Sequence, residues 1–173
     1  LLNMSRLGQD QLMLEYKTFN LHEMLSKSCN HVRLEDKHDL ILTGNESIEV
    51  YADEHRIEQV VVNLVNNAVK YAKESREIHI LTESLDDHVK NSVQDFGEGI
   101  SESVIPHLFD RYYRADHLGS SYSGLGLGLY ICSEIIRKHS GKIGVHSKIG
   151  EGSTFWFTIP AKTGRIIADA ALN

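Results

Sequence analysis

The chain has 173 residues, 41% of them hydrophobic and 24% charged, which suits one globular domain with a real core. Its net charge of −6 argues against broad nucleic-acid binding, because that function needs a basic face. The sequence has no run of about eighteen apolar residues that would span a membrane and no recognisable signal peptide. We therefore expect no contact with nucleic acid or membrane. The start without Met suggests a fragment of a longer protein.

The N-terminal part shows two helical patterns and two short strand patterns. Residues 1–16 carry apolar side chains at helical spacing and read as the end of a helix, or as a stray amphipathic helix that packs on its own domain. A capping box at Asn20 opens a helix of about three turns that continues to Val32. Residues 40–42 and 48–51 read as short strands around a Gly-Asn turn.

The most regular helix spans Asp53 to Ala72, with Asp53 as its candidate N-cap. Its apolar residues recur three and four positions apart and predict a buried face. Asn63 and Asn67 are four residues apart, so their amides lie side by side on another face, whereas Asn66 is rotated away. Because asparagine is a poor helix former, the pair indicates a functional role.

Two strands, at residues 77–82 and 88–93, are predicted after this helix. Asn91 departs from the pattern, because alternation from Val89 to Val93 predicts an inward apolar residue at its position. We expect either a solvated strand end or a local bulge that shifts the register.

The C-terminal half begins with a short helical segment after Ser101 and a polar stretch, residues 111–123, that reads as a mobile lid. Residues 128–139 form a predicted helix. Strands are expected at 142–147 and 154–159. Residues 161–173 show no convincing pattern.

Three glycines, Gly124, Gly126 and Gly128, alternate with Leu125 and Leu127 between the lid and the last helix. Glycine lets backbone N–H groups approach a ligand, and a helix N-terminus adds unpaired donors and a partial positive charge. The stretch therefore predicts an anion site, with a polyphosphate as the expected anion. The alternative is a glycine-rich turn that only packs tightly before a buried helix.

A second glycine-rich stretch, from Asp95 to Ile100, carries the pattern Asp-x-Gly-x-Gly. An ionised carboxylate only accepts hydrogen bonds, so Asp95 can accept one from a donor group of a ligand. Gly97 and Gly99 let the backbone turn sharply and leave room for a flat ligand. An isolated pattern of this kind would indicate an ordinary turn aspartate.

The order of these stretches resembles the catalytic ATP-binding domain of sensor histidine kinases, over roughly residues 20–160. The matching motifs are the N box around Asn63 and Asn67, the G1 box at 95–99, the F box at 108–114 and the G2 box at 124–128. The resemblance implies an α/β two-layer sandwich, shared with gyrase, MutL and heat-shock-ninety proteins. In this fold a mixed sheet of about five strands carries about three helices on one face, and ATP and Mg²⁺ are the cofactors.

The resemblance implies that Asp95 accepts a hydrogen bond from the exocyclic amine of adenine, with Gly97 and Gly99 leaving room for the base. It implies that Tyr71 lines the adenine or ribose edge, with core packing as the alternative. The full expected set is Asn63, Asn67, Lys70, Tyr71, Asp95, Gly97, Gly99, Ile100, Arg111, Arg114, Gly124, Leu125, Gly126, Leu127 and Gly128.

Mg²⁺ prefers oxygen ligands, and the resemblance gives Asn67 the direct contact and Asn63 a supporting one. Lys70 can reach a phosphate as a point charge, or it is a solvated surface lysine. Arg114 resembles the arginine that contacts the terminal phosphate in this family, and Arg111 is a weaker candidate. We therefore predict Arg114 and Lys70 as the catalytic residues.

The resemblance implies a protein histidine kinase that transfers the γ-phosphate of ATP to a histidine, from which it passes to a response regulator. No histidine here lies in the family's phosphoacceptor context. We expect residues 1–16 to be the remnant of a dimerisation and phosphoacceptor domain, 17–160 the catalytic domain, and 161–173 a disordered or vector-derived tail. The acceptor histidine would belong to the missing part of a homodimer. The fragment is expected to be cytoplasmic, and its parent an inner-membrane receptor.

Other functions stay open from the sequence. ATPase clamps of the gyrase, MutL or chaperone type also use an asparagine helix and Asp-x-Gly-x-Gly, but the F box, the form of the G2 box and the small size argue against them. Such a clamp would need a glutamate base, for which Glu58 is the nearest acid. A degenerate domain that only binds nucleotide or docks partners is a second alternative. A serine-directed anti-sigma kinase is a third, although it usually lacks the F box.

The two cysteines, Cys29 and Cys132, fall on predicted helices without a partner motif. We expect two reduced, partly buried thiols. The ten histidines form no metal-binding motif, so no metal site is predicted from them.

Overall fold

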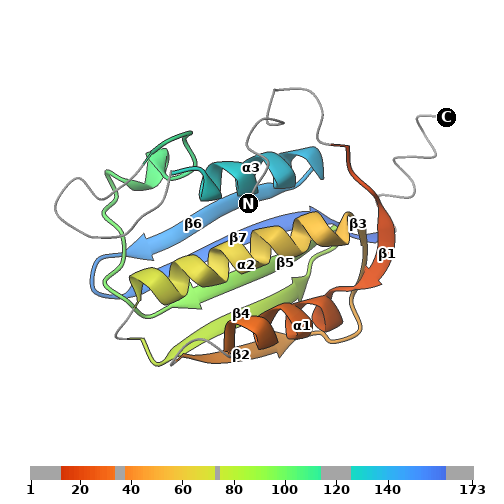
Figure 1. The fold of residues 1–173 in the computed structure, drawn as a ribbon, viewed down its shortest axis with the longest axis horizontal. Helices are drawn as coiled ribbons and strands as arrows, with labels where there is room; N and C mark the ends of the chain where they lie inside the picture. Colours follow the sequence, from red (N-terminus) through yellow and green to blue (C-terminus); the bar gives the residue numbers. More distant parts are fainter. Residues whose placement is uncertain (1–12, 34–37, 73–74, 114–125, 163–173) are drawn as a thin grey trace.

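Helices and strands separate into two layers (Figure 1). The computed structural model describes residues 13–33, 38–72, 75–113 and 126–162. In chain order the elements are β1 (Lys17–Asn20), α1 (Leu21–Arg33), β2 (Asp39–Gly44), β3 (Glu49–Ala52), α2 (Glu54–Tyr71), β4 (Glu77–Ser84), β5 (His88–Asp95), the 3-10 helix η2 (Ile105–His107), α3 (Gly128–Lys138), β6 (Lys142–Lys148) and β7 (Gly152–Pro160).

The main sheet has five strands in the order β2-β4-β5-β7-β6. Strand β2 pairs with β4 in parallel, and the other pairs are antiparallel, so the sheet is mixed. Helices α1, α2 and α3 lie together on one face of this sheet, with α2 in the middle (Figure 1). The predicted two-layer sandwich is therefore confirmed.

Helix α2 forms where the apolar periodicity predicts it, and its buried residues are Ile57, Val60, Val61, Leu64, Val65 and Ala68. Asp53 is its N-cap, because the Asp53 side chain accepts a hydrogen bond from the backbone N–H of Arg56. Asn20 caps α1 in the same way, through the backbone N–H of Glu23. Both predicted helix starts are confirmed by these contacts.

The pairing of the first strands differs from what the sequence suggests. Strands β2 and β3 exist, but they do not pair with each other: β2 joins β4, and β3 pairs with β1 in a separate two-stranded sheet. Strand β1 was not predicted, because its four residues bury only Phe19 and show no alternation. Partners that lie far apart in the chain cannot be identified from local patterns.

Both explanations for Asn91 are wrong. Its side chain is fully buried, and the registers of β5 with β4 and with β7 continue through it without a bulge. The Asn91 amide nitrogen donates to the Thr82 hydroxyl at 3.0 Å, so a polar pair forms between neighbouring strands inside the core. Hydrogen bonding to Thr82 reduces the cost of burying this amide.

The core lies between the helices and the sheet, and both cysteines belong to it. Burial raises the pKa of the Cys132 thiol to about 12, so this thiol stays protonated and unreactive at neutral pH. Within the described ranges, no helix combines the length and apolarity that a membrane crossing requires.

Candidate functional site

The predicted site residues that the structure describes come from α2, β5 and α3 and from the loops near them. Tyr71 is the last residue of α2, Asp95 is the last residue of β5, and Gly128 is the first residue of α3. The ends of α2 and β5 and the start of α3 lie towards the left in Figure 1. Motifs that are distant in the sequence are thus brought to one edge of the fold.

Gly128 joins the G2 box to the N box. A Cβ atom built on Gly128 would lie 2.8 Å from the amide nitrogen of Asn63 and 2.9 Å from its amide oxygen. Only glycine therefore lets the start of α3 approach the asparagine helix without moving that amide. Leu127 occupies the N-cap of α3, and its side chain cannot accept a hydrogen bond from the helix N-terminus.

Asp95 presents a nearly buried carboxyl group, with 6% of its surface exposed. Burial raises its pKa, while hydrogen bonds from the backbone N–H groups of Gly97 and Ser153 oppose the shift. The Gly97 N–H donates to the Asp95 Oδ1 atom at 3.0 Å. A desolvated acid at the end of a strand suits the recognition of a hydrogen-bond donor.

The glycines after Asp95 permit close backbone contacts. A Cβ on Gly97 would lie 2.8 Å from the Cβ of Ala72, so the loop after β5 packs directly on the C-terminal end of α2. Gly99 has a φ of +75°, and a Cβ there would lie 2.1 Å from the carbonyl oxygen of Lys148. The Ile100 N–H donates to the Ser147 hydroxyl at 2.8 Å. These contacts fix the loop against both α2 and β6.

On α2, the side chains of Asn63 and Asn67 are half-buried and Asn66 is exposed, which agrees with the predicted rotation of Asn66 away from the pair. Tyr71 is 52% exposed, so the alternative that it packs in the core is wrong. The Lys70 ammonium donates to the Tyr71 hydroxyl at 3.0 Å and lies 4.7 Å from the centre of its ring. A cation and an aromatic surface therefore stand together at the end of the helix.

The F box is described up to Tyr113. Phe109 packs on the core with its ring centre 6.4 Å from that of Phe155. The Arg111 guanidinium lies 4.8 Å from the centre of the Tyr112 ring. The Tyr112 N–H donates to the carbonyl oxygen of Gly126 at 3.0 Å, which connects the two borders of the predicted lid.

Three of the predicted site residues, Arg114, Gly124 and Leu125, lie outside the described residues, as does most of the predicted lid.

The chemistry of this end fits a metal–nucleotide complex. In the described part of the chain, no cluster of three or more His, Cys, Asp or Glu side chains could hold a metal ion by itself. The half-buried amides of Asn63 and Asn67 offer neutral oxygen ligands, which suit Mg²⁺ when phosphate oxygens complete its shell. The N-terminus of α3, next to Asn63, presents backbone N–H groups that could bind such phosphates.

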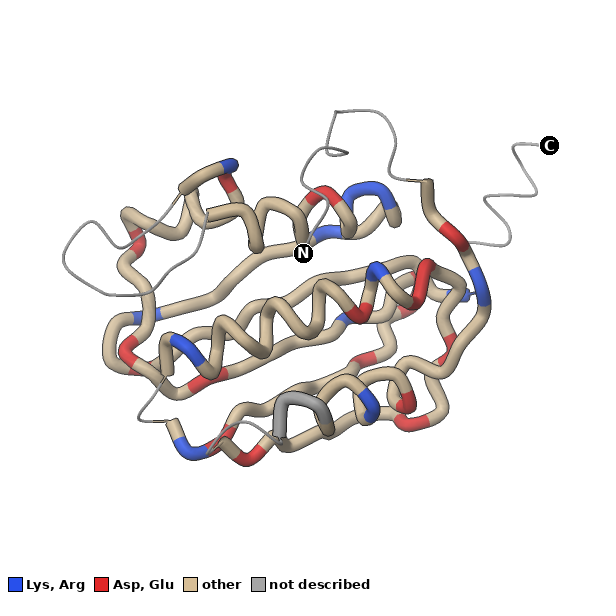
Figure 2. Tube along the Cα trace, viewed as in Figure 1, with Lys and Arg blue, Asp and Glu red and all other residues tan. Residues whose placement is uncertain are grey.

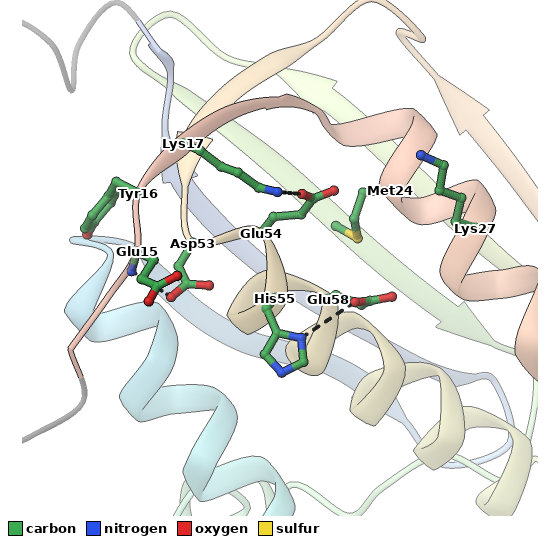
Figure 3. A pocket seen from close by; sticks show the side chains of 9 residues that line it. All are labelled: Glu15, Tyr16, Lys17, Met24, Lys27, Asp53, Glu54, His55 and Glu58. Atoms are coloured by element: carbon green, nitrogen blue, oxygen red, sulfur yellow. Dashed lines mark hydrogen bonds and ion pairs between the residues drawn. The ribbon is translucent and has the colours of Figure 1, made fainter.

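A hollow of about 510 Å³ lies at the other end of the fold and contains none of the predicted site residues. Figure 3 shows that it is lined by β1 and its preceding residues, α1 and the start of α2. Its lining residues are Glu15, Tyr16, Lys17, Met24, Lys27, Asp53, Glu54, His55 and Glu58. Glu58 accepts a hydrogen bond from the Ser28 hydroxyl on α1 at 3.0 Å. The nearest acid to the N box therefore belongs to this hollow.

Buried His139 connects the elements around this second end. Its Nε2 atom accepts from the Asp53 N–H at 3.1 Å, and its Nδ1–H donates to the carbonyl oxygen of Ile135 at 2.8 Å. Asp53 also accepts from the Glu15 N–H at 2.9 Å. These hydrogen bonds connect the residues before β1, the start of α2 and the end of α3. No sequence motif indicated this connection.

Comparison with known proteins places this geometry in a family. Residues 52–163 match the family described as histidine kinase-, DNA gyrase B-, and HSP90-like ATPase. Histidine kinase 5 of Arabidopsis thaliana is 31% identical over 196 residues, which cover 95% of this chain and 21% of that protein. Adaptive-response sensory kinase SasA of Crocosphaera subtropica is 44% identical over 112 residues, 64% of this chain and 29% of that protein. The chain spans less than a third of the length of these two relatives.

Solved structures agree with this assignment. The catalytic domain of histidine kinase ThkA superposes with a TM-score of 0.71 at 32% identity, covering 85% of this chain and 96% of that domain. Full-length ShkA in complex with AMPPNP gives a TM-score of 0.80 at 25% identity, over 91% of this chain and 34% of ShkA. ThkA in complex with the response regulator TrrA gives 0.75 at 31% identity, over 90% of this chain and 44% of that one.

The motifs, their convergence at one end of the sandwich and these similarities lead to one conclusion. The chain belongs to the family of histidine kinase-, DNA gyrase B- and HSP90-like ATPases, and within it to the ATP-binding catalytic domains of sensor histidine kinases.

Proposed function

We propose that this domain binds ATP with Mg²⁺ where α2 ends and α3 begins, and donates the γ-phosphate to a histidine on a separate dimerisation domain. The observation that carries the proposal is the close approach of Gly128 to the Asn63 amide, because the backbone N–H groups at the start of α3 could then bind phosphates beside an amide oxygen suited to Mg²⁺. ATP and a protein histidine would give ADP and phosphohistidine.

Asp95 recognises the base in this proposal. Its carboxylate accepts a hydrogen bond from the exocyclic amine of adenine, and its burial strengthens that bond. Gly97 and Gly99 keep the adjoining backbone free of side chains, and Ile100 and exposed Tyr71 flank the base and ribose.

The phosphates lie towards the start of α3. Asn67 contacts Mg²⁺ directly and Asn63 supports it, while the backbone of the G2 box, from Gly124 through Leu125, Gly126 and Leu127 to Gly128, binds the phosphates. Lys70 contributes a charge at the end of α2.

Arg114, with Arg111 as the weaker candidate, stabilises the phosphoryl group during transfer. Arg114 and Lys70 are therefore the proposed catalytic residues.

The proposed partners follow from the sequence, because no histidine in this chain lies in the family's phosphoacceptor context. We assign residues 1–16 to the end of a dimerisation and phosphoacceptor domain, 17–160 to the catalytic domain and 161–173 to a tail. The full protein would be a cytoplasmically facing homodimer whose phosphohistidine is consumed by the receiver domain of a response regulator. ThkA, a structural relative, has been solved in complex with such a regulator, TrrA. We place the parent protein in the inner membrane.

The test is transfer of label from γ-³²P-ATP. The chain should label a separately supplied dimerisation hairpin that carries the acceptor histidine, and a hairpin with that histidine replaced should stay unlabelled. Stoichiometric labelling of this chain alone would contradict the proposal, because no histidine in it has the acceptor context.

The ATPase-clamp alternative is weakened by the position of Glu58. A catalytic base must lie within hydrogen-bond reach of the attacking water, whereas Glu58 lines the distant hollow and binds Ser28. Steady ATP hydrolysis that is lost in Glu58→Ala would revive this alternative.

A further inference from the structure

A buried hydroxyl lies directly behind the loop that carries Asp95. Ser75 is 5% exposed, and its Oγ atom donates to the carbonyl oxygen of Glu77 at 2.7 Å. The same oxygen accepts a hydrogen bond from the N–H of Phe96 at 3.3 Å. Phe96 is the residue after Asp95, so Ser75 fixes the backbone at the position where the acid leaves the strand.

Ser75 is also tied to the end of α2. Its backbone N–H donates to the carbonyl oxygen of Ala72 at 2.8 Å, and the His38 Nε2–H donates to the same oxygen at 3.3 Å. Ala72 in turn packs against Gly97, the residue after Phe96. Ala72, Ser75, Phe96 and Gly97 therefore form a closed ring of contacts between the helix end and the loop.

These four residues determine the spacing between two parts of the proposed site. On one side stands Tyr71, the neighbour of Ala72, and on the other stands the Asp95 carboxyl group. The side chain of Phe96 does little to hold the loop, because 48% of it is exposed. Among the described residues, its one aromatic contact is a T-shaped one with His79. The loop is held instead by contacts of its backbone, one of which is the hydrogen bond to the Ser75 hydroxyl.

We propose that Ser75 is a positioning residue for adenine binding: its hydroxyl holds the Phe96 backbone, and thereby Asp95, at the distance from α2 that admits the base. This inference deepens the proposed function and rests on it, because it assumes that Asp95 receives the base. Ser75 itself does not touch the nucleotide.

The experiment compares Ser75→Ala with Ser28→Ala in the whole chain. Ser28 is the control, because it is also a buried serine whose hydroxyl bonds to a backbone carbonyl, that of Met24 at 2.9 Å. It lies on α1, and its hydroxyl also contacts the Glu58 carboxylate at 3.0 Å. ADP and ATP affinities are measured by calorimetry with Mg²⁺. Urea unfolding gives the stability of each variant, and NMR hydrogen exchange follows the Phe96 amide.

Ser75→Ala should weaken ADP and ATP binding by the same factor, about three- to tenfold, because the lost hydrogen bond acts on the base and not on the γ-phosphate. Exchange of the Phe96 amide should accelerate, since this N–H loses its acceptor. Ser28→Ala should lower stability to a similar extent and leave both affinities unchanged.

Three results would overturn the inference. Unchanged nucleotide affinity in Ser75→Ala, with binding by the wild type intact, would refute the role of Ser75 and leave the proposed function standing. An equal loss of affinity in Ser28→Ala would reduce the effect to general destabilisation. Failure of the wild type to bind either nucleotide would refute this inference and the proposed function together.

Discussion

The two ends of the sandwich are built in opposite ways. At the end that carries the proposed nucleotide site, called here the nucleotide end, helix termini and glycines bring backbone groups together, and Leu127 leaves the N-terminus of α3 without a side-chain cap. At the other end, acidic and basic residues alternate along β1 and the start of α2 (Figure 2), and several of them line the hollow. There Lys17 pairs with Glu54, and Asp53 is occupied by backbone N–H groups.

A hollow does not by itself identify a binding site. The space of about 510 Å³ lies at the end where many polar groups already bind one another. The nucleotide end offers a desolvated acid, paired amides and an uncapped helix, which are groups that a ligand can satisfy. We therefore expect substitutions at one end to change affinity and substitutions at the other to change stability.

The largest effect is expected for Asp95→Asn, which removes a buried charge with little change in shape. ATP affinity should fall at least about tenfold, because a hydrogen bond to a charged acceptor is worth roughly 1.5–3 kcal/mol. Burial raises the pKa of Asp95, so the fold disfavours the ionised form, and stability at pH 7 should stay equal or rise. Calorimetry and urea unfolding measure both. A variant that loses stability but keeps its affinity would reverse the assignment of this end.

The same acid predicts a dependence of binding on pH. The pKa of Asp95 lies above its ordinary value of 3.8, so the carboxyl takes up its proton at a higher pH than an exposed aspartate does. ATP affinity should therefore fall as the pH is lowered through that raised pKa, by up to about tenfold per unit below it. Calorimetry across a series of buffers should give this profile for the wild type and a flatter one for Asp95→Asn. Identical profiles would exclude Asp95 as the titrating group.

The next largest effect is expected for Gly128→Ala, which should lower ATP affinity about three- to tenfold. The new Cβ would lie 2.8 Å from the Asn63 amide nitrogen, so this amide must move out of its position. Gly150→Ala is the control, because its added Cβ would enter open space. The φ of +82° at this position nevertheless strains an alanine. Gly150→Ala should lower stability by about 1 kcal/mol and leave affinity unchanged. Equal ATP affinities of Gly128→Ala and Gly150→Ala would contradict the proposal that the N box lies at the phosphate site.

At the opposite end, Asp53→Ala should reduce stability alone. The variant removes the N-cap of α2 and the acceptor of the Glu15 N–H, and the loss of an N-cap costs about 1 kcal/mol. Because the proposed site begins ten residues further along α2, ATP affinity should stay within about twofold of the wild type. Urea unfolding and calorimetry provide the comparison. A large loss of affinity would show that the two ends are coupled.

The smallest effect is expected for Lys17→Met. The ion pair of Lys17 with Glu54 is largely exposed on the lysine side, where 62% of the side-chain surface is accessible. Such pairs contribute roughly 0–1 kcal/mol, and we expect a stability change below about 0.5 kcal/mol with no change in nucleotide binding. A larger effect in thermal unfolding would mean that the hollow is organised by its charges.

Local patterns predicted those parts of the fold that local physics determines. Helix α2 was predicted because its apolar residues recur at helical spacing and Asp53 can cap it. Asn91 was misjudged because its partner, Thr82, lies on another strand. Strand β1 was missed for the same reason, since its pairing with β3 is set by tertiary structure.

The candidate site divides in a similar way. Motif order indicated Asp95, Asn63 and the glycines, because their residue types are unusual at those spacings. Ser75 could not be found, because it stands in an ordinary polar run and its acceptor role depends on Phe96, 21 residues further along the chain. The roles assigned to all of the site residues, Arg114 and Gly124 included, remain predictions.

The contrast between the two ends can be tested in one NMR titration of the whole chain with Mg²⁺ and a non-hydrolysable ATP analogue. Amide shifts should concentrate at Gly97, Gly99 and Gly128, and those of Lys17, Glu54 and His55 should stay in place. Shifts centred on the hollow, with an unperturbed loop after β5, would contradict the account.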